Sequence, residues 1–234
     1  MAVGYNPKIV TDNLVLALDA GNTKSYPGSG TTWTDLSGNS NTGTLTNGPT
    51  YSSDNGGSIV FDGTDQYISC GSSSDFAFGA GDFSIEMWWY SDNTQTNLTG
   101  LLSLSNANAA NNWQLGPGST DHGSSNTQIV FTGGGHNSDP EIVDPTNYTN
   151  QVWTNTVVTR TSGTIKMYSN GVSVGSTTDS SNFSSTGPLK IGVNRGDNKY
   201  WSGKISNVKL YKGKAHTAAE VQQNFNALRG RFGI

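Results

Sequence analysis

Short apolar runs recur along the whole chain, each separated from the next by Gly, Asn, Ser, Thr or Pro. Several runs alternate apolar and polar positions in the way that half-buried strands do. In the segment 83–89, for example, the apolar residues Phe83, Ile85, Met87 and Trp89 share one face. The pattern predicts strands at 14–18, 58–61, 66–70, 83–90, 100–105, 112–115, 128–132, 152–160, 164–169, 172–175, 189–193 and 203–211.

The sharpest local pattern is an Asn-Gly pair between two alternating runs. Asn170 and Gly171 predict a two-residue turn with both residues at positive φ, and strands joined in this way are antiparallel neighbours. Roughly a dozen strands without helices between them predict two packed antiparallel sheets, an all-β sandwich of the jelly-roll type. The alternation slips once between Ile205 and Val208, as it does at a β-bulge.

One helix is expected, near the C-terminal end of the chain. Thr217 and Glu220 have the spacing of a capping box, in which each side chain satisfies a backbone amide of the other. Apolar side chains then follow at helical spacing, namely Val221, Phe225 and Leu228. Gly230 is placed to end the helix. We expect a short helix over 217–229 that packs on the sandwich edge, with docking to a partner as the alternative.

Composition supports the all-β interpretation. Ser, Thr and Asn make up about a third of the 234 residues, and only three residues are Glu. Exposed helices normally use many Glu and Lys, so a helical bundle is excluded. The aromatic content of 10% argues against disorder. No shift in composition marks a domain boundary, so we expect an N-terminal arm over 1–12 and one sandwich over 13–234.

Charge and hydropathy exclude several classes of protein. The net charge is −4 and no basic stripe is present, so no nucleic-acid binding is expected. The longest apolar run, 14–18, is far shorter than the roughly 20 residues of a membrane helix, so we expect no membrane insertion. The first residues lack a basic region followed by an apolar core, so no secretory signal is expected. Cys70 is the only cysteine, which excludes an intramolecular disulfide.

Eight short phrases, spread from about residue 14 to residue 225, carry a family resemblance. They are LVLALDAGN (14–22), WTDLSGN (33–39), IVFDGTDQYI (59–68), FSIEMW (83–88), VWTNTVV (152–158), MYSNGV (167–172), GKISNVKLY (203–211) and AAEV (218–221). In this order they resemble the laminin-G-like domains of the concanavalin A-like lectin and glucanase superfamily. The resemblance implies a jelly-roll β-sandwich, a fold that hosts enzymes, lectins and structural parts.

A narrower resemblance rests on the segments 19–26, 44–51 and 227–232. They are similar to single-domain laminin-G-like proteins of tailed phages, marine ones especially, which are capsid decorations or tail and fibre components. The resemblance implies a non-catalytic virion protein, assembled in the bacterial host cytoplasm and displayed for adhesion to cell-surface glycans. Its partners would be other virion proteins of the capsid or tail. The alternatives are an autonomous calcium-dependent carbohydrate-binding module and a degenerate glycoside hydrolase.

Candidate catalytic residues are sparse. Glucanases similar to this chain carry two glutamates and an aspartate on one strand face, as nucleophile and acid. The comparable strand here offers only Glu86, while Glu141 lies in a loop and Glu220 on the helix. The Gly-x-Ser-x-Gly string at 171–175 falls in the strand predicted at 172–175 and not between a strand and a helix, where a serine nucleophile would be exposed. We therefore expect no enzymatic activity.

Three groups of residues have the oxygen ligands that calcium takes, and laminin-G-like and pentraxin-like relatives often bind this ion. The groups are Asp19 with Asn22, Asp62 with Asp65, and Asp139 with Glu141 and Asp144. For the second group the competing interpretation is a turn in which Asp caps backbone amides. The third group forms the most charge-dense acidic loop. The candidate calcium site is therefore Asp139, Glu141 and Asp144, with a solvated loop as the alternative.

Several aromatic and polar residues at strand ends or in loops have the chemistry of a glycan site, because sugars are held by aromatic faces and by amide and carboxylate hydrogen bonds. The candidate set is Trp201, Tyr200, Asn198, Arg195, His136 and Trp113. Taken singly, each loop aromatic also fits a role in the core. Together they favour a sugar-facing rim, and the segment 194–201 is the first choice.

Weakly protected strand edges predict association with a neighbour. Edge strands are normally guarded by Lys, Pro or bulges, and 13 Lys plus Arg leave few strands with such a guard. Pairing within a virion or a homo-oligomer is therefore expected. The arm 1–12 and the tail 229–234 are the expected docking segments, with frayed ends as the alternative. A virion protein would then need these segments to attach, whereas a free lectin would not.

Overall fold

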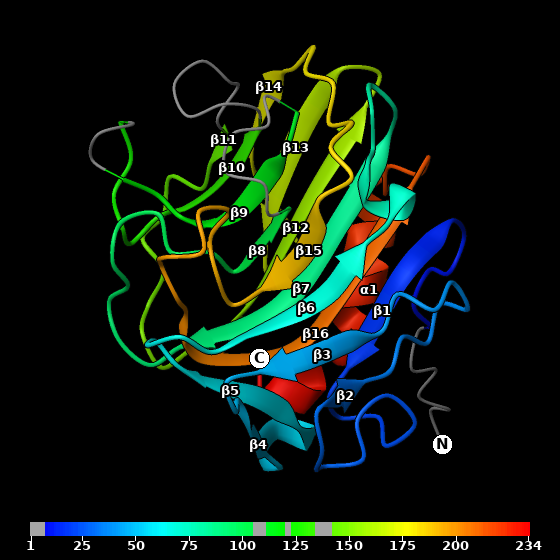
Figure 1. Cartoon of the computed structure of the whole chain (residues 1–234). Coiled ribbons are helices and arrows are strands. Elements are labelled where there is room, and N and C mark those ends of the chain that lie inside the picture. Colours follow the sequence, from blue (N-terminus) through cyan, green and yellow to red (C-terminus); the bar gives the residue numbers. More distant parts are fainter. Residues whose placement is uncertain (1–7, 105–110, 120–122, 134–141) are drawn as a thin grey trace, which may run out of the picture.

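The computed structural model describes residues 8–104, 111–119, 123–133 and 142–234. Within them the chain folds into two antiparallel sheets that pack face to face, with one α-helix on the outer face of one sheet (Figure 1). This is the all-β jelly roll with a C-terminal helix that the sequence predicts. Two single-turn 3₁₀ helices, η1 (Asp54–Gly56) and η2 (Ser74–Phe76), lie in the connections.

The described strands form two sheets, here called sheet A and sheet B. The strands of sheet A are β1 (Leu14–Asp19), β4 (Thr50–Ser52), β5 (Ser58–Asp62), β7 (Phe83–Ser91), β12 (Trp153–Thr161), β13 (Thr164–Ser169), β14 (Val172–Thr178) and β16 (Ser202–Lys212). Their order is β14-β13-β12-β7-β16-β5-β4, and β1 also pairs with β16. The strands of sheet B are β2 (Thr32–Trp33), β3 (Gly43–Thr46), β6 (Tyr67–Ser72), β8 (Leu102–Leu104), β9 (Trp113–Pro117), β10 (Ile129–Gly133), β11 (Ile142–Val143) and β15 (Pro188–Ile191). Their order is β11-β10-β9-β8-β15-β6-β3-β2.

The core between the sheets follows the alternation read from the sequence. Phe83, Ile85, Met87 and Trp89 of β7 all belong to the main buried cluster, as predicted. The Asn-Gly turn is confirmed, because Asn170 and Gly171 have φ of 47° and 80° and join β13 to β14. The expected bulge is confirmed too, since the register of β16 against β7 shifts between Ile205 and Asn207.

A single buried aspartate organises the long polar connection that follows β1. Asp35 accepts hydrogen bonds from the amides of Ala17, Ser37 and Asn41, at 2.8, 2.9 and 3.0 Å. These bonds tie the turn before β3 to strand β1. The segment is therefore ordered through side-chain-to-backbone bonds, which is how Asp and Asn act in turns.

The helix α1 (Ala218–Phe232) covers the outer face of sheet A (Figure 1). The predicted capping box is present, with Thr217 as N-cap and Glu220 as its partner. Trp88 of β7 stacks on Phe225 and Phe232 of α1, with ring centroids 5.6 and 4.2 Å away. In the described part of the chain, no helix has the length and apolar character needed to cross a membrane.

The helix continues past Gly230, so the prediction that this glycine ends it is wrong. Helical structure runs to Phe232, and Gly233 instead adopts the left-handed conformation, with φ of 75° and its amide bonded to the carbonyl of Arg229. The reason is tertiary. Phe232 is buried between Trp88 and Trp153, and this packing stabilises a last turn that the local sequence does not favour.

The tail 229–234, an expected docking segment, is tied to the fold through Arg231. Its guanidinium donates to Asp19 Oδ1, to the carbonyls of Asn55 and Gly57 and to Ser206 Oγ, at 2.6 to 2.8 Å. These bonds hold the end of α1 to sheet A. The tail is thus part of the fold, and trimming it would test stability as much as attachment.

The described residues of the predicted arm, 8–12, also lie against the helix. The amide of Val10 donates to Asn224 Oδ1 at 2.8 Å, and the hydroxyl of Tyr211 donates to the carbonyl of Val10 at 2.9 Å. Gln223 Nε2 donates to the carbonyl of Lys8. This stretch is consequently fixed between β16 and α1.

Replacing Phe232 with alanine is expected to destabilise the protein by about 3 to 5 kcal/mol, because the ring fills the space between two tryptophans. The control is Ile234→Ala two residues later, where the side chain is exposed and the expected change is within about 0.5 kcal/mol. Urea unfolding followed by tryptophan fluorescence measures both. Equal midpoints for the two variants would contradict the assigned packing.

A buried histidine lies just before α1. His216 packs edge-on against the ring of Tyr211, and neither ring nitrogen has a hydrogen-bond partner among the described residues. Burial lowers its pKa, although the nearby carboxylates of Glu86 and Glu220 act in the opposite direction. Burial also tends to raise the pKa of Glu220, but hydrogen bonds from Lys214 and Thr217 outweigh this effect and lower that pKa to about 2.

We expect two separate acid transitions in stability. The unfolded chain protonates His216 below pH about 6.5, while the folded chain resists protonation. The free energy of unfolding should therefore fall as pH decreases through 6.5, by at most about 1.4 kcal/mol per pH unit. Because the pKa of Glu220 is lowered in the folded chain, its contribution to the free energy of unfolding is present above about pH 4.5 and is lost as the pH falls toward 2.

His216→Phe should remove the upper transition and retain stability at pH 8, since it keeps a ring beside Tyr211 and removes two unpartnered nitrogens. Glu220→Gln should change only the lower transition. Unfolding curves measured from pH 3 to pH 8 distinguish them. An unchanged slope around pH 6 in His216→Phe would rule out His216 as its source.

Candidate functional site

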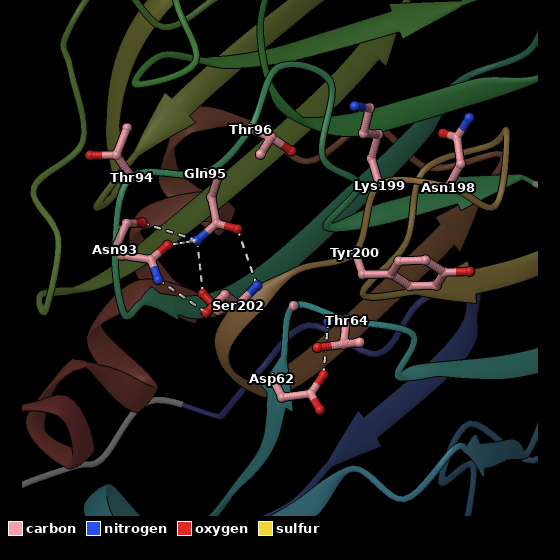
Figure 2. Close-up of a pocket in the computed structure, with 11 residues that line it drawn as sticks. Asp62, Thr64, Asn93, Thr94, Gln95, Thr96, Asn198, Lys199, Tyr200 and Ser202 are labelled. Carbon is pink, nitrogen blue, oxygen red and sulfur yellow. Dashed lines mark hydrogen bonds between the residues drawn. The ribbon is translucent and has the colours of Figure 1, made fainter.

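Three connections meet at one end of the sandwich and enclose a polar pocket of about 390 Å³ (Figure 2). They are the turn between β5 and β6, the segment after β7 and the segment between β15 and β16. The pocket is lined by Asp62, Gly63, Thr64, Asn93, Thr94, Gln95, Thr96, Asn198, Lys199, Tyr200 and Ser202.

The buried amide of Gln95 joins two of these connections. Its Nε2 donates to the carbonyl of Ser202 at 2.8 Å and to Ser91 Oγ at 2.8 Å, and its Oε1 accepts from the amide of Ser202 at 3.1 Å. Figure 2 shows the bonds from Gln95 to Ser202 and a further bond from Gln95 Nε2 to the carbonyl of Asn93. Both polar ends of Gln95 are thus satisfied, and the segment after β7 is fixed to the start of β16.

A second buried amide fixes the connection between β15 and β16. Asn194 Oδ1 accepts from the amides of Asn198 and Lys199 at 3.1 and 3.2 Å, and Asn194 Nδ2 donates to Asn198 Oδ1 at 3.1 Å. Within this loop Asp197 adopts a positive φ of 54°. The bonds close the loop on itself, and it therefore presents Lys199 and Tyr200 in a defined position.

The turn between β5 and β6 supplies the pocket's carboxylate. Asp62 Oδ1 accepts from the amide of Thr64 at 2.8 Å, and Gly63 between them has φ of 79°. This is the amide-capping turn that competed with calcium binding in the interpretation of Asp62 and Asp65. Asp62 is exposed, and it faces the same pocket as Lys199 (Figure 2).

The pocket combines one aromatic ring with amide, hydroxyl and opposite charged groups. The ring of Tyr200 is half-buried, and its hydroxyl donates to the carbonyl of Asp197 at 2.9 Å, which fixes the ring's direction. A ring face with convergent polar groups suits a polyhydroxylated ligand, whose carbon face stacks while its hydroxyls bond.

The structure places the predicted glycan residues in different environments. Asn198 and Tyr200 lie at the pocket, and the loop 194–201 chosen from the sequence is indeed one of its walls. Arg195 is buried, and its amide donates to Gln114 Oε1 at 3.1 Å outside the pocket lining. His136 lies outside the described residues.

The two tryptophans predicted as glycan contacts are corrected by their burial. Trp201 and Trp113 are both fully buried in the main core. Trp201 meets Trp89 edge-on with ring centroids 5.5 Å apart, and Trp113 Nε1 donates to the carbonyl of Phe76 at 3.1 Å. Alternation places Trp201 inward from its neighbour Tyr200, so replacing Trp201 would test the core and not a binding surface.

Sequence reasoning missed Gln95, Asn93 and Thr96. They lie in a polar stretch directly after β7, and this position at a strand end is the one signal that the sequence offers. Nothing in the local sequence indicates that Gln95 meets Ser202, because their contact spans 107 positions of the chain.

The predicted calcium site is described only at Asp144, because Asp139 and Glu141 lie outside the described residues. Asp144 is buried, and its Oδ1 accepts from the amide of Thr146 at 2.9 Å. Within the described ranges, no three His, Cys, Asp or Glu residues come together to hold a metal. Since calcium takes six to eight oxygens, the described residues alone do not make its site.

Glu86, the single glutamate on the glucanase-like strand, has a structural role. It is fully buried beneath α1, with Oε1 3.1 Å from Lys209 Nζ and Oε2 accepting from Asn224 Nδ2 at 2.7 Å. Glu220 is likewise engaged, in the capping box. Neither glutamate faces the pocket, so neither is placed to act on a ligand there.

Residues 62–222 match the family model Laminin_G_3 of the concanavalin A-like lectin/glucanases superfamily, and the chain belongs to this family. No curated protein matches the chain.

Among solved structures, two toxin binding domains and one domain of an arabinanase have similar folds. The binding domain of Paraclostridial mosquitocidal protein 1 has a TM-score of 0.70 at 17% identity, over 93% of this chain and 52% of that one. Domain 4 of AbnA, a GH43 extracellular arabinanase from Geobacillus stearothermophilus, was solved in complex with arabinotriose. It has a TM-score of 0.69 at 19% identity, over 91% of this chain and 98% of that one. The binding domain of botulinum neurotoxin DC in complex with SialylT has a TM-score of 0.69 at 16% identity, over 93% of this chain and 52% of that one. The chain thus spans about half the length of the two toxin domains, and these identities show the fold alone.

Proposed function

We propose that this chain is a non-catalytic carbohydrate-binding domain and that the pocket around Tyr200 holds the glycan. One observation carries the proposal. The polar lining of the pocket is fixed by two buried amides, Gln95 and Asn194, before any ligand arrives. A fixed site loses little conformational entropy on binding, which matters for a ligand that forms many weak hydrogen bonds.

The chemistry of the lining fits a sugar better than a large apolar ligand. Asp62, Thr64 and Asn198 offer acceptors and donors around a single aromatic ring. Ring hydroxyls need such partners, because a polar group removed from water without one is costly. The fold supports the same class, since one solved domain of similar fold is in complex with arabinotriose.

Binding is favoured over hydrolysis by the fate of Glu86. Its carboxylate is paired with Lys209 and Asn224 beneath the helix, away from the pocket. A glycosidase needs two carboxyl groups flanking the scissile bond. At the pocket the described residues place one carboxylate, that of Asp62.

Tyr200→Ala is expected to weaken glycan binding at least about tenfold, because it removes the stacking surface. Tyr200→Phe should retain most of the affinity, since the ring remains. The measurement is titration calorimetry with whichever polysaccharide the wild type selects from a neutral and acidic panel.

The matched control is Tyr51→Ala, a half-buried tyrosine that does not line the pocket. Melting temperatures are measured for all variants, so that lost binding is compared among folded proteins. Absence of wild-type binding across the panel would refute the proposed function. If Tyr200→Ala and the wild type bind the glycan with equal affinity, the glycan site does not lie at Tyr200.

We further propose that the domain is displayed on the virion of a tailed phage, as a capsid decoration or a tail or fibre component. The support is the resemblance of the segments 19–26, 44–51 and 227–232 to such proteins. Association with virion neighbours or as a homo-oligomer belongs to this proposal, whereas calcium at Asp139, Glu141 and Asp144 belongs to the alternative, a free calcium-dependent carbohydrate-binding module. Mass spectrometry of density-purified particles should detect the chain in stoichiometric amount. Its absence from particles would favour a free carbohydrate-binding module.

A further inference from the structure

A second, smaller pocket of about 190 Å³ lies beside the first. It opens between the segment that follows β11, the start of β12 and the turn from β13 to β14. Trp89 and Ile129 supply apolar surface, and Tyr148 contributes a half-buried ring. At roughly 30 Å³ per water, this volume equals about six water molecules, which is room for one sugar residue.

A buried carboxylate in its lining is only partly satisfied. Asp144 is 7% exposed, and one of its oxygens accepts from the amide of Thr146. The other oxygen, Oδ2, has no hydrogen-bond partner among the residues that the structure describes. Oδ2 is also not among the fully buried polar atoms that lack a partner, so it is open to the pocket and is an acceptor available to a ligand.

Two hydroxyls in the same lining are also available. The side chains of Thr154 and Ser169 line the pocket from β12 and β13, and neither hydroxyl has a partner among the described residues. Thr154 is 9% exposed. A carboxylate oxygen and two hydroxyls from three different elements therefore surround an apolar surface, which is the combination that a sugar ring requires.

The two pockets share a wall. The hydroxyl of Tyr148, whose ring lines the second pocket, accepts from the amide of Gln95 in the first at 3.3 Å. Asn150 Nδ2 donates to Thr94 Oγ1 at 3.1 Å, which joins the same two segments. Beneath them, Trp89 meets Tyr148 and Trp201 edge-on, with ring centroids 5.3 and 5.5 Å away.

We propose that the Asp144 pocket is a second subsite of the glycan site and that it takes one neutral sugar residue of a chain whose neighbouring residues lie at Tyr200. The inference rests on the proposed function and names its ligand class, a neutral oligosaccharide spanning both pockets. A buried carboxylate accepts from sugar hydroxyls and repels the carboxylate of a uronic or sialic acid at close range. Asp144 thereby selects against acidic sugars.

The test is calorimetric titration with neutral series of one to six residues, namely arabino-, xylo-, cello- and malto-oligosaccharides, beside oligogalacturonates and sialyllactose. For the wild type, affinity should rise with chain length within the neutral series that binds. Asp144→Asn keeps an acceptor for the Thr146 amide and removes the charge. In this variant affinity should no longer rise with chain length. Affinity for the longest oligosaccharide should fall at least tenfold, and affinity for the shortest should change little.

The matched control is Asp54→Asn, an exposed acid that lines neither pocket and should leave every affinity unchanged. A second measurement uses the wild type alone. The amide resonances of Thr154 and Asn170 should shift on adding the long oligosaccharide and stay in place on adding the monosaccharide.

The outcomes separate the two proposals. If Tyr200→Ala abolishes binding while Asp144→Asn and the amides of the second pocket are unaffected, the subsite is refuted and the proposed function stands. Loss of long-chain binding in EDTA would overturn direct contact with Asp144 in favour of a metal. If the wild type binds no oligosaccharide and no polysaccharide, both proposals fall.

Discussion

The burial of strand β7 on both of its faces is the constraint on which the rest of the structure depends. Its inward side chains fill the core between the sheets, and they are Phe83, Ile85, Met87 and Trp89. Its outward side chains, Glu86 and Trp88, are equally buried beneath α1. A strand covered on both faces needs a layer on each side. The C-terminal helix is therefore a required third layer of this sandwich.

Adjacent residues of β7 connect the helix to the ligand-binding end. Trp88 points outward and stacks on Phe225 and Phe232. Trp89 points inward and meets Trp201 and Tyr148, which support the two pockets. The same strand thus fixes the helix through one ring and the binding loops through the next, so a loss of helix packing should also loosen the site.

The loops are held by buried polar side chains and not by charge or apolar anchors alone. Asp35, Gln95 and Asn194 each satisfy several backbone groups of a connection, and each is buried. This explains a composition with about a third Ser, Thr and Asn and few charged residues. Side-chain-to-backbone bonds do in these loops what sheet ladders do elsewhere.

The sequence determined the elements whose cause is local. Alternation predicts the core face of β7, and the Asn170-Gly171 pair predicts the turn between β13 and β14. The spacing of Thr217 and Glu220 predicts the start of the helix. Each of these features depends on neighbouring residues. Resemblance adds the family, and the aromatic and polar residues of the loop 194–201 mark it as a candidate binding loop.

Tertiary structure decided the rest. Gly230 continues the helix because Phe232 is buried between two distant tryptophans. Trp113 and Trp201 are of the residue type expected at a sugar-binding rim, but both are buried in the core. Gln95 meets Ser202 only because β7 and β16 pair, and Asp144 lies near Thr154 only because the chain returns. Contacts between residues far apart in sequence leave no local pattern, and they are the contacts that build both pockets.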